Sequence, residues 1–82
     1  MESAAPTVLW RLFKPLRHRS LSEGGGQARA RAVILPGGPP YTLAFFANDA
    51  MDRVENYDTM DIAMYRANEI KRSLADEGWT ED

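Results

Sequence analysis

A single long amphipathic helix near the C-terminus is the strongest structural signal in this chain. Between residues 58 and 77, apolar side chains recur at helical spacing; they are Met60, Ala63, Met64, Ala67, Ile70 and Leu74. This period predicts one apolar stripe along a helix. Asp58 or Thr59 supplies the N-cap, and Gly78 ends the helix. If Gly78 is residue C′, Trp79 is residue C″ and packs on Leu74 as in a Schellman motif, which favours a packing role for Trp79 over a binding role.

The segment before this helix predicts antiparallel strands. Residues 29–35 alternate Arg29 and Arg31 with small apolar side chains, and residues 41–47 are rich in aromatic and β-favouring types. The second strand is apolar on both faces and is expected to be central. Residues 53–57 are a weaker candidate for a third strand. The fold class expected is α+β, with a small two- or three-stranded antiparallel sheet packed against one long C-terminal helix.

The first 28 residues have a different character. Leu9, Leu12, Phe13 and Leu16 share one helical face, but Pro15 interrupts the pattern. We therefore expect a basic aromatic arm that is partly helical or disordered. Residues 20–28 include three consecutive glycines and two serines, a composition typical of a flexible linker. The expected organisation is an arm and linker over residues 1–28 and a ββ(β)α body over residues 29–82.

Charge is distributed unevenly along the chain. Residues 1–35 hold six Lys or Arg against two acids, a net +4, and residues 36–82 hold four against ten, a net −6. This division suggests that arm and body meet different partners, or that they attract each other. Since one helix covers only one face of a sheet, the other face is solvated, covered by the arm, or paired with a second copy.

Composition excludes several chemistries. With 82 residues and no cysteine, the chain is one domain at most and has no disulfide, Cys-ligated zinc, iron–sulfur cluster or thiol nucleophile. The three glycines are followed by Gln27 and Ala28, whereas a phosphate loop requires Lys and Ser or Thr there. No apolar run suggests a signal peptide or a membrane span, so a cytoplasmic location is expected.

Neither a metal site nor an active site is predicted. Acidic residues recur at every third position from Asp49 to Asp61, but this spacing splays carboxylates apart and favours a soluble edge or a docking surface for basic groups. His18, the only histidine, lies between two arginines with nothing to orient it. We expect no enzyme activity, no cofactor, no metal and no small-molecule substrate.

The sequence thus favours a small non-enzymatic protein-interaction module. It is expected to dock a protein partner, or a second copy of itself, through the arm and the open sheet face. The arm residues that would contact the partner are Leu9, Trp10, Arg11, Leu12, Phe13, Lys14, Leu16 and Arg17.

Two alternatives to protein docking remain open. The first is nucleic-acid binding, since aromatic and basic residues interleave along the arm. Its contacts would be Arg11, Lys14, Arg17, Arg19, Arg29 and Arg31. The second is peripheral membrane contact, in which Trp10, Phe13 and Leu16 enter the interface.

Overall fold

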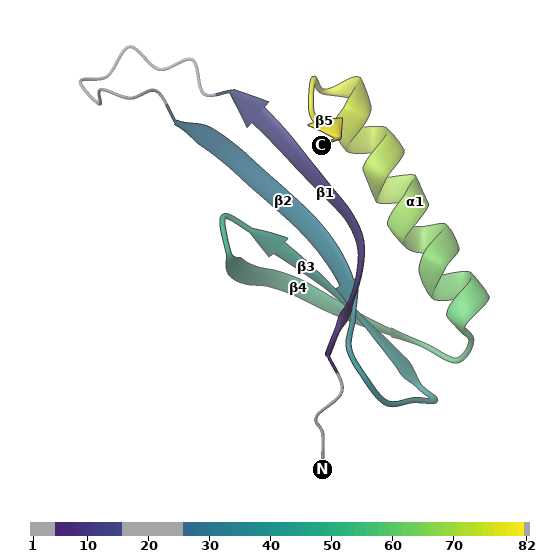
Figure 1. The fold of residues 1–82 in the computed structure, drawn as a ribbon. Helices are drawn as coiled ribbons and strands as arrows, with labels where there is room; N and C mark the ends of the chain where they lie inside the picture. Colours follow the sequence, from purple (N-terminus) through teal and green to yellow (C-terminus); the bar gives the residue numbers. More distant parts are fainter. Residues whose placement is uncertain (1–4, 16–25, 82) are drawn as a thin grey trace.

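The computed structural model describes residues 5–15 and 26–81. It forms a five-stranded antiparallel sheet in the order β4-β3-β2-β1-β5, with one helix along one face (Figure 1). The elements are β1 (Thr7–Pro15), β2 (Gln27–Ile34), β3 (Tyr41–Ala47), β4 (Ala50–Tyr57), α1 (Met60–Asp76) and β5 (Thr80–Glu81). The α+β class holds, but the expected sheet of two or three strands is wrong.

The main correction concerns the supposed arm, whose described part is a strand. β1 pairs along its length with β2, from Thr7 opposite Ile34 to Pro15 opposite Gln27. A bulge between Val8 and Trp10 breaks the two-residue alternation. Leu9, Leu12 and Phe13 therefore fit the spacing of a helix as well as that of a bulged strand. A short apolar run cannot be assigned to a helix or a strand from its period alone. Pro15 is tolerated because it ends the strand.

The other strands follow the sequence pattern more closely. β2 and β3 lie where alternation placed them, and the weak third strand is real and longer than expected, beginning at Ala50. β3 is an interior strand, but β2 is the middle of the five, because β1 and β5 extend the sheet beyond it. A two-residue turn, Asn48-Asp49, joins β3 to β4 with both residues at positive φ, as in a type I′ hairpin.

Both ends of α1 are capped as expected. Thr59 is the N-cap, and its hydroxyl accepts a hydrogen bond from the Ile62 amide at 3.3 Å. At the other end, the Trp79 amide donates to the Leu74 carbonyl and the Gly78 amide to the Ala75 carbonyl, each at 3.1 Å. These two bonds define a Schellman motif. Trp79 packs against the core together with Leu74, which confirms its structural role.

The core lies between α1 and one face of the sheet. Its buried residues come from three strands and the helix; they are Trp10, Leu12, Ala32, Ile34, Leu43, Phe45, Ala63 and Ala67. Ala63 and Ala67 are the buried residues of α1, and Ile70 and Leu74 pack beside them. The apolar stripe that contacts the sheet is narrower than the sequence predicted. Met60 and Met64 lie outside it, 39% and 47% exposed.

Candidate docking surface

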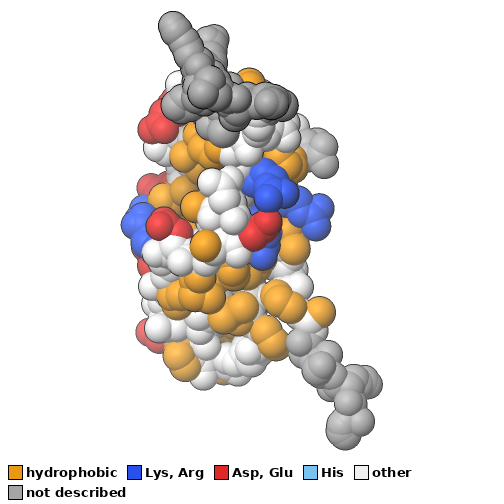
Figure 2. Space-filling view, turned by 90° about the vertical axis from the view of Figure 1, so that its left-hand side faces the viewer, with side chains coloured by type: hydrophobic (Ala, Val, Ile, Leu, Met, Phe, Trp, Pro, Cys, Tyr) orange, Lys and Arg blue, Asp and Glu red, His pale blue; other side chains and the backbone are white. Residues whose placement is uncertain are grey.

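The sheet face turned away from α1 is covered by no described element, and Figure 2 shows this face. Apolar side chains spread across it, and a group of Lys or Arg side chains lies beside them with an acidic side chain among them. Strand register arranges these residues in two neighbouring rows that run across the sheet, and each row takes one residue from each of β1 to β4.

The first row is apolar. Val8, Val33, Ala44 and Val54 are successive cross-strand partners from β1 to β4. Val33 and Ala44, in the middle, are buried at 4% and 0% exposure, whereas Val8 and Val54, at the ends, are 42% and 44% exposed. The row therefore has a buried centre and two exposed apolar ends.

The second row is basic and aromatic. Arg11 on β1 is paired directly with Arg31 on β2, Arg31 with Phe46 on β3, and Phe46 with Met51 on β4. The Arg31 guanidinium carbon lies 4.3 Å from the centre of the Phe46 ring, a cation–π contact. Like charges directly opposite each other destabilise a sheet. The Arg11–Arg31 pair is thus a feature that folding alone does not favour.

One carboxylate partly offsets this charge. Asp49, in the β3–β4 turn, pairs with Arg29 at 2.8 Å and with Arg31 at 2.9 Å. The turn is held over β2 because the Asn48 side-chain oxygen accepts from the Arg29 amide, and the Asn48 amide donates to the Arg29 carbonyl. Arg11 has no ion-pair partner within residues 5–15 and 26–81.

These side chains line a shallow groove of about 200 Å³. Its walls are Arg11, Phe13, Arg29, Ala30, Arg31, Phe46 and Asp49, so three guanidinium groups face one carboxylate, a net charge of +2. The side chains of Asp49 and Arg29 are 58% and 52% exposed. Ion pairs this exposed contribute about 0–1 kcal/mol each, so the two Asp49 pairs add little to the stability of the fold.

A second, larger hollow of about 330 Å³ is lined chiefly by the β3–β4 hairpin and the C-terminal half of α1. Its lining includes the core residues Trp10, Phe45 and Leu74, with Asp52 and Arg53 also among its walls. It is an extension of the core, whereas the open-face groove carries a net positive charge.

The structure separates the predicted arm residues. Trp10 and Leu12 are buried beneath α1, at 5% and 1% exposure, and Leu9 packs against the same core. The Lys14 ammonium lies 5.9 Å from the centre of the Trp79 ring. Of the arm residues that the structure describes, only Arg11 and Phe13 line the groove, where they meet Arg29 and Arg31. The remaining predicted contacts lie outside the described residues; they are Leu16, Arg17 and Arg19.

Three residues of the groove, Ala30, Phe46 and Asp49, were not predicted as binding residues, and neither were Met51 and the four members of the apolar row. The alternation of residues 41–47 places Phe46 on one strand face, but only the register of β2 against β3 brings it opposite Arg31. Asp49 belongs to the acidic series, which the fold disperses. Asp49 lies in the turn facing β2, and Glu55 points toward the helix. Across the described parts of the chain, no three His, Asp or Glu side chains converge as metal ligands.

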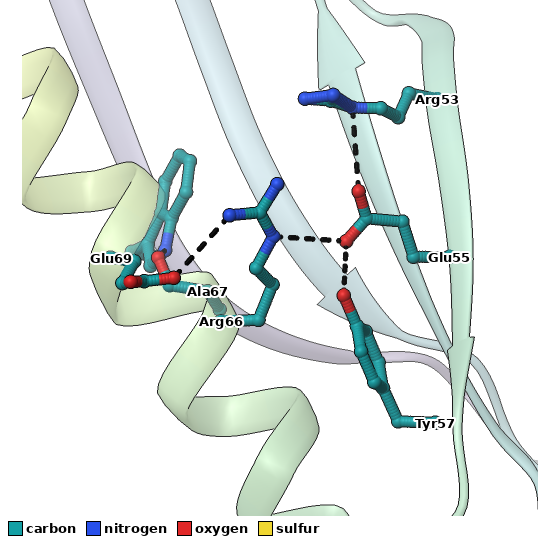
Figure 3. Close-up of polar contacts among 7 residues, drawn as sticks. Arg53, Glu55, Tyr57, Arg66, Ala67 and Glu69 are labelled. Atoms are coloured by element: carbon teal, nitrogen blue, oxygen red, sulfur yellow. Dashed lines mark hydrogen bonds and ion pairs between the residues drawn. The ribbon is translucent and has the colours of Figure 1, made fainter.

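A polar network on the other face joins β4 to α1 (Figure 3). Glu55 accepts hydrogen bonds from the Tyr57 hydroxyl at 2.5 Å and from Arg66 Nε at 3.2 Å, and Arg66 also pairs with Glu69 at 3.3 Å. The Tyr57 hydrogen bond lowers the pKa of Glu55 and raises that of Tyr57. Near neutral pH both groups keep their charge state, so this network is suited to holding the helix rather than to transferring protons.

α1 has 17 residues and is amphipathic; neither it nor any other described segment is a helix long and apolar enough to cross a bilayer. Comparison of the chain with known protein families, with curated proteins and with solved structures returned no match.

Proposed function

We propose that this protein is a small non-enzymatic interaction module that docks an acidic, partly apolar segment of a protein partner on its open sheet face. The observation that carries the proposal is the direct opposition of Arg11 and Arg31 across β1 and β2. Two guanidinium groups held side by side are unfavourable in the free protein and become favourable when a carboxylate binds between them.

The neighbouring apolar row supports a peptide occupant over a free anion. Val8 and Val54 expose apolar surface beside the charged groove, and Phe46 continues it beneath Arg31. A segment that carries both acidic and apolar side chains would satisfy the two rows at once. The charges would steer its approach, and apolar burial would supply affinity.

A selection of random peptides on the immobilised full-length chain tests this proposal. Enriched peptides are expected to combine acidic and apolar residues, and they should lose affinity for the charge-reversed variant Arg31→Glu. Arg72→Glu is the matched control, since Arg72 is an exposed arginine on α1, away from this face. The proposal fails if no peptide is enriched, or if the enriched peptides bind the Arg31→Glu variant as well as the unchanged protein.

Nucleic-acid binding is the second candidate, and one observation favours it. The groove combines three arginines with the rings of Phe13 and Phe46, and sheet faces that carry aromatics can stack unpaired bases. A labelled single-stranded oligonucleotide separates the two proposals. Phosphate-driven binding should weaken steeply between about 50 and 200 mM salt. Peptide docking that rests partly on apolar burial should weaken much less.

A further inference from the structure

We propose that the outer edge of β4 pairs with the same edge of a second copy of this chain. The two sheets then join into one continuous ten-stranded sheet around a twofold axis at Val54. The outer edge of β4 lies outside the charged groove of the proposed function and shares only Val54 with the apolar row beside that groove, so the pairing does not depend on the proposed function.

β4 is the exposed end of the sheet. It pairs with β3 on one side only, and no described strand or helix covers its other side. Six of its eight residues are exposed, among them Met51 at 53% and Val54 at 44%. A strand of this length offers a row of free backbone donors and acceptors to another strand. The opposite end of the sheet is partly protected, because β5 pairs with β1 at Leu12 and Phe13.

Charge selects one register for this pairing. In antiparallel self-pairing centred on Val54, Arg53 of each chain lies opposite Glu55 of the other, which places two opposite-charge pairs beside the axis. Shifting the centre to Arg53 sets Arg53 against its own copy, and shifting it to Glu55 sets Glu55 against its own copy. Both shifts oppose like charges. Only the register centred on Val54 is electrostatically complementary among those that keep the two helices on the same face.

The local geometry of β4 is compatible with this register. Residues from Arg53 to Tyr57 pair with β3 in regular steps, and the bulge lies before them. Glu55 Oε1 is occupied by Tyr57 and Arg66, but Oε2 lies 3.7 Å from Arg53 Nε, too far for a hydrogen bond. Oε2 can therefore accept a hydrogen bond from Arg53 of the second copy.

The apolar row supports the same arrangement. Val54 ends the row that runs from Val8 through Val33 and Ala44. When Val54 meets its own copy, the row continues into the second sheet and the exposed end of the first becomes covered. Directly opposed residues lie on the same side of a sheet, so both helices lie on one face and both basic grooves on the other.

A single introduced thiol tests both the pairing and its register, because the chain contains no cysteine. In the proposed dimer, antiparallel partners at position 54 have Cα atoms about 4.5–5.5 Å apart, within reach of a disulfide. The full-length Val54→Cys variant should therefore form a disulfide-linked dimer under mild oxidation. Asn56→Cys is the matched control on the same face. Its two copies lie four residues apart along the strands, roughly 13 Å, and should stay unlinked.

Sedimentation of the unmodified chain and of a Val54→Lys variant supplies an independent readout. The unmodified chain is expected to sediment as two chains and the variant as one. The variant should keep the circular dichroism spectrum of the folded chain because position 54 is exposed, but its melting temperature should no longer rise with protein concentration. Three results would each overturn the proposal. They are a chain that is monomeric at every concentration tested, a Val54→Lys variant that is still dimeric, and a thiol at position 56 that links as fast as one at position 54.

Discussion

Trp10 connects the sheet to the helix through one buried contact. Its indole Nε1 donates to the Ala67 carbonyl at 2.9 Å, and its ring lies 6.2 Å from that of Phe45. Replacing Trp10 with Phe removes the hydrogen bond and leaves a small void, so the free energy of unfolding should fall by about 1–3 kcal/mol. Urea unfolding measures the loss. Trp79→Phe is the control, and because Trp79 is only half-buried its loss should be smaller. Equal losses would contradict the assignment of Trp10 to the centre of the core.

Glu55 gives the molecule a defined response to pH. Its pKa lies below the ordinary value of 4.5 in the folded chain, chiefly because Tyr57 donates a hydrogen bond to it. The folded state therefore binds this proton less readily than the unfolded state does. The stabilisation is complete above about pH 4.5 and is lost as the pH falls through the lower, folded pKa. Thermal unfolding of a Glu55→Gln variant should show a weaker dependence on pH in this acidic window than the unmodified chain does.

Tyr57 reports on the same contact from the alkaline side. Glu55 raises the pKa of Tyr57 above its ordinary value of 10.0, because the hydroxyl must keep its proton to donate. This stabilisation is present below about pH 10 and disappears at higher pH. In the Glu55→Gln variant, the Tyr57 pKa, followed by NMR of the labelled ring, should move down toward its ordinary value. An unchanged Tyr57 titration would show that the hydrogen bond does not persist in solution.

At the scale of the element, the C-terminal end of α1 depends on one glycine. Gly78 has φ +101°, and an added Cβ would meet only the Lys14 side chain, at 3.8 Å. Space is thus available, and the penalty of Gly78→Ala is conformational, about 1 kcal/mol. For a domain of this size the melting temperature should fall by about 4–8 °C. Glu77→Ala is the control, because Glu77 has φ −94° and ψ 8°, which alanine adopts readily. Similar melting temperatures for the two variants would contradict the Schellman cap.

The elements differ in how far the sequence could predict them, for a physical reason. α1, β2 and β3 have strong local periods and clear turn or cap residues, so neighbouring residues determine them. β1 was missed because its bulge disrupts alternation and its pairing is with residues beyond the glycine-rich segment. β5 has two residues, too few for any pattern. The docking surface depends on register between strands, and register is a long-range property. Arg29 and Arg31 were predicted to share a face, but the positions of Arg11 and Phe46 beside them were not.

At the scale of the whole molecule, the core cannot be assigned to residues 29–82 alone. β1 contributes Trp10 and Leu12, two of the largest buried side chains, and it lies between β2 and β5. Without β1, Ala32 and Ile34 would keep their partners on β3 but lose those on β1, and β5 would have no strand to pair with. A body of fewer than 60 residues is already marginal in the surface that it can bury.

A chain that begins at Gln27 should therefore lose cooperative folding, since it lacks all of β1. Circular dichroism during heating measures this, with the full chain as reference and Arg11→Ala as the matched control. Arg11 is exposed on the open face, so that variant should keep the melting temperature of the full chain or raise it slightly by relieving the repulsion with Arg31. A sharp unfolding transition in the shortened chain would instead establish residues 27–82 as an independent domain. β1 would then be a detachable strand, and its buried face would be available to other molecules.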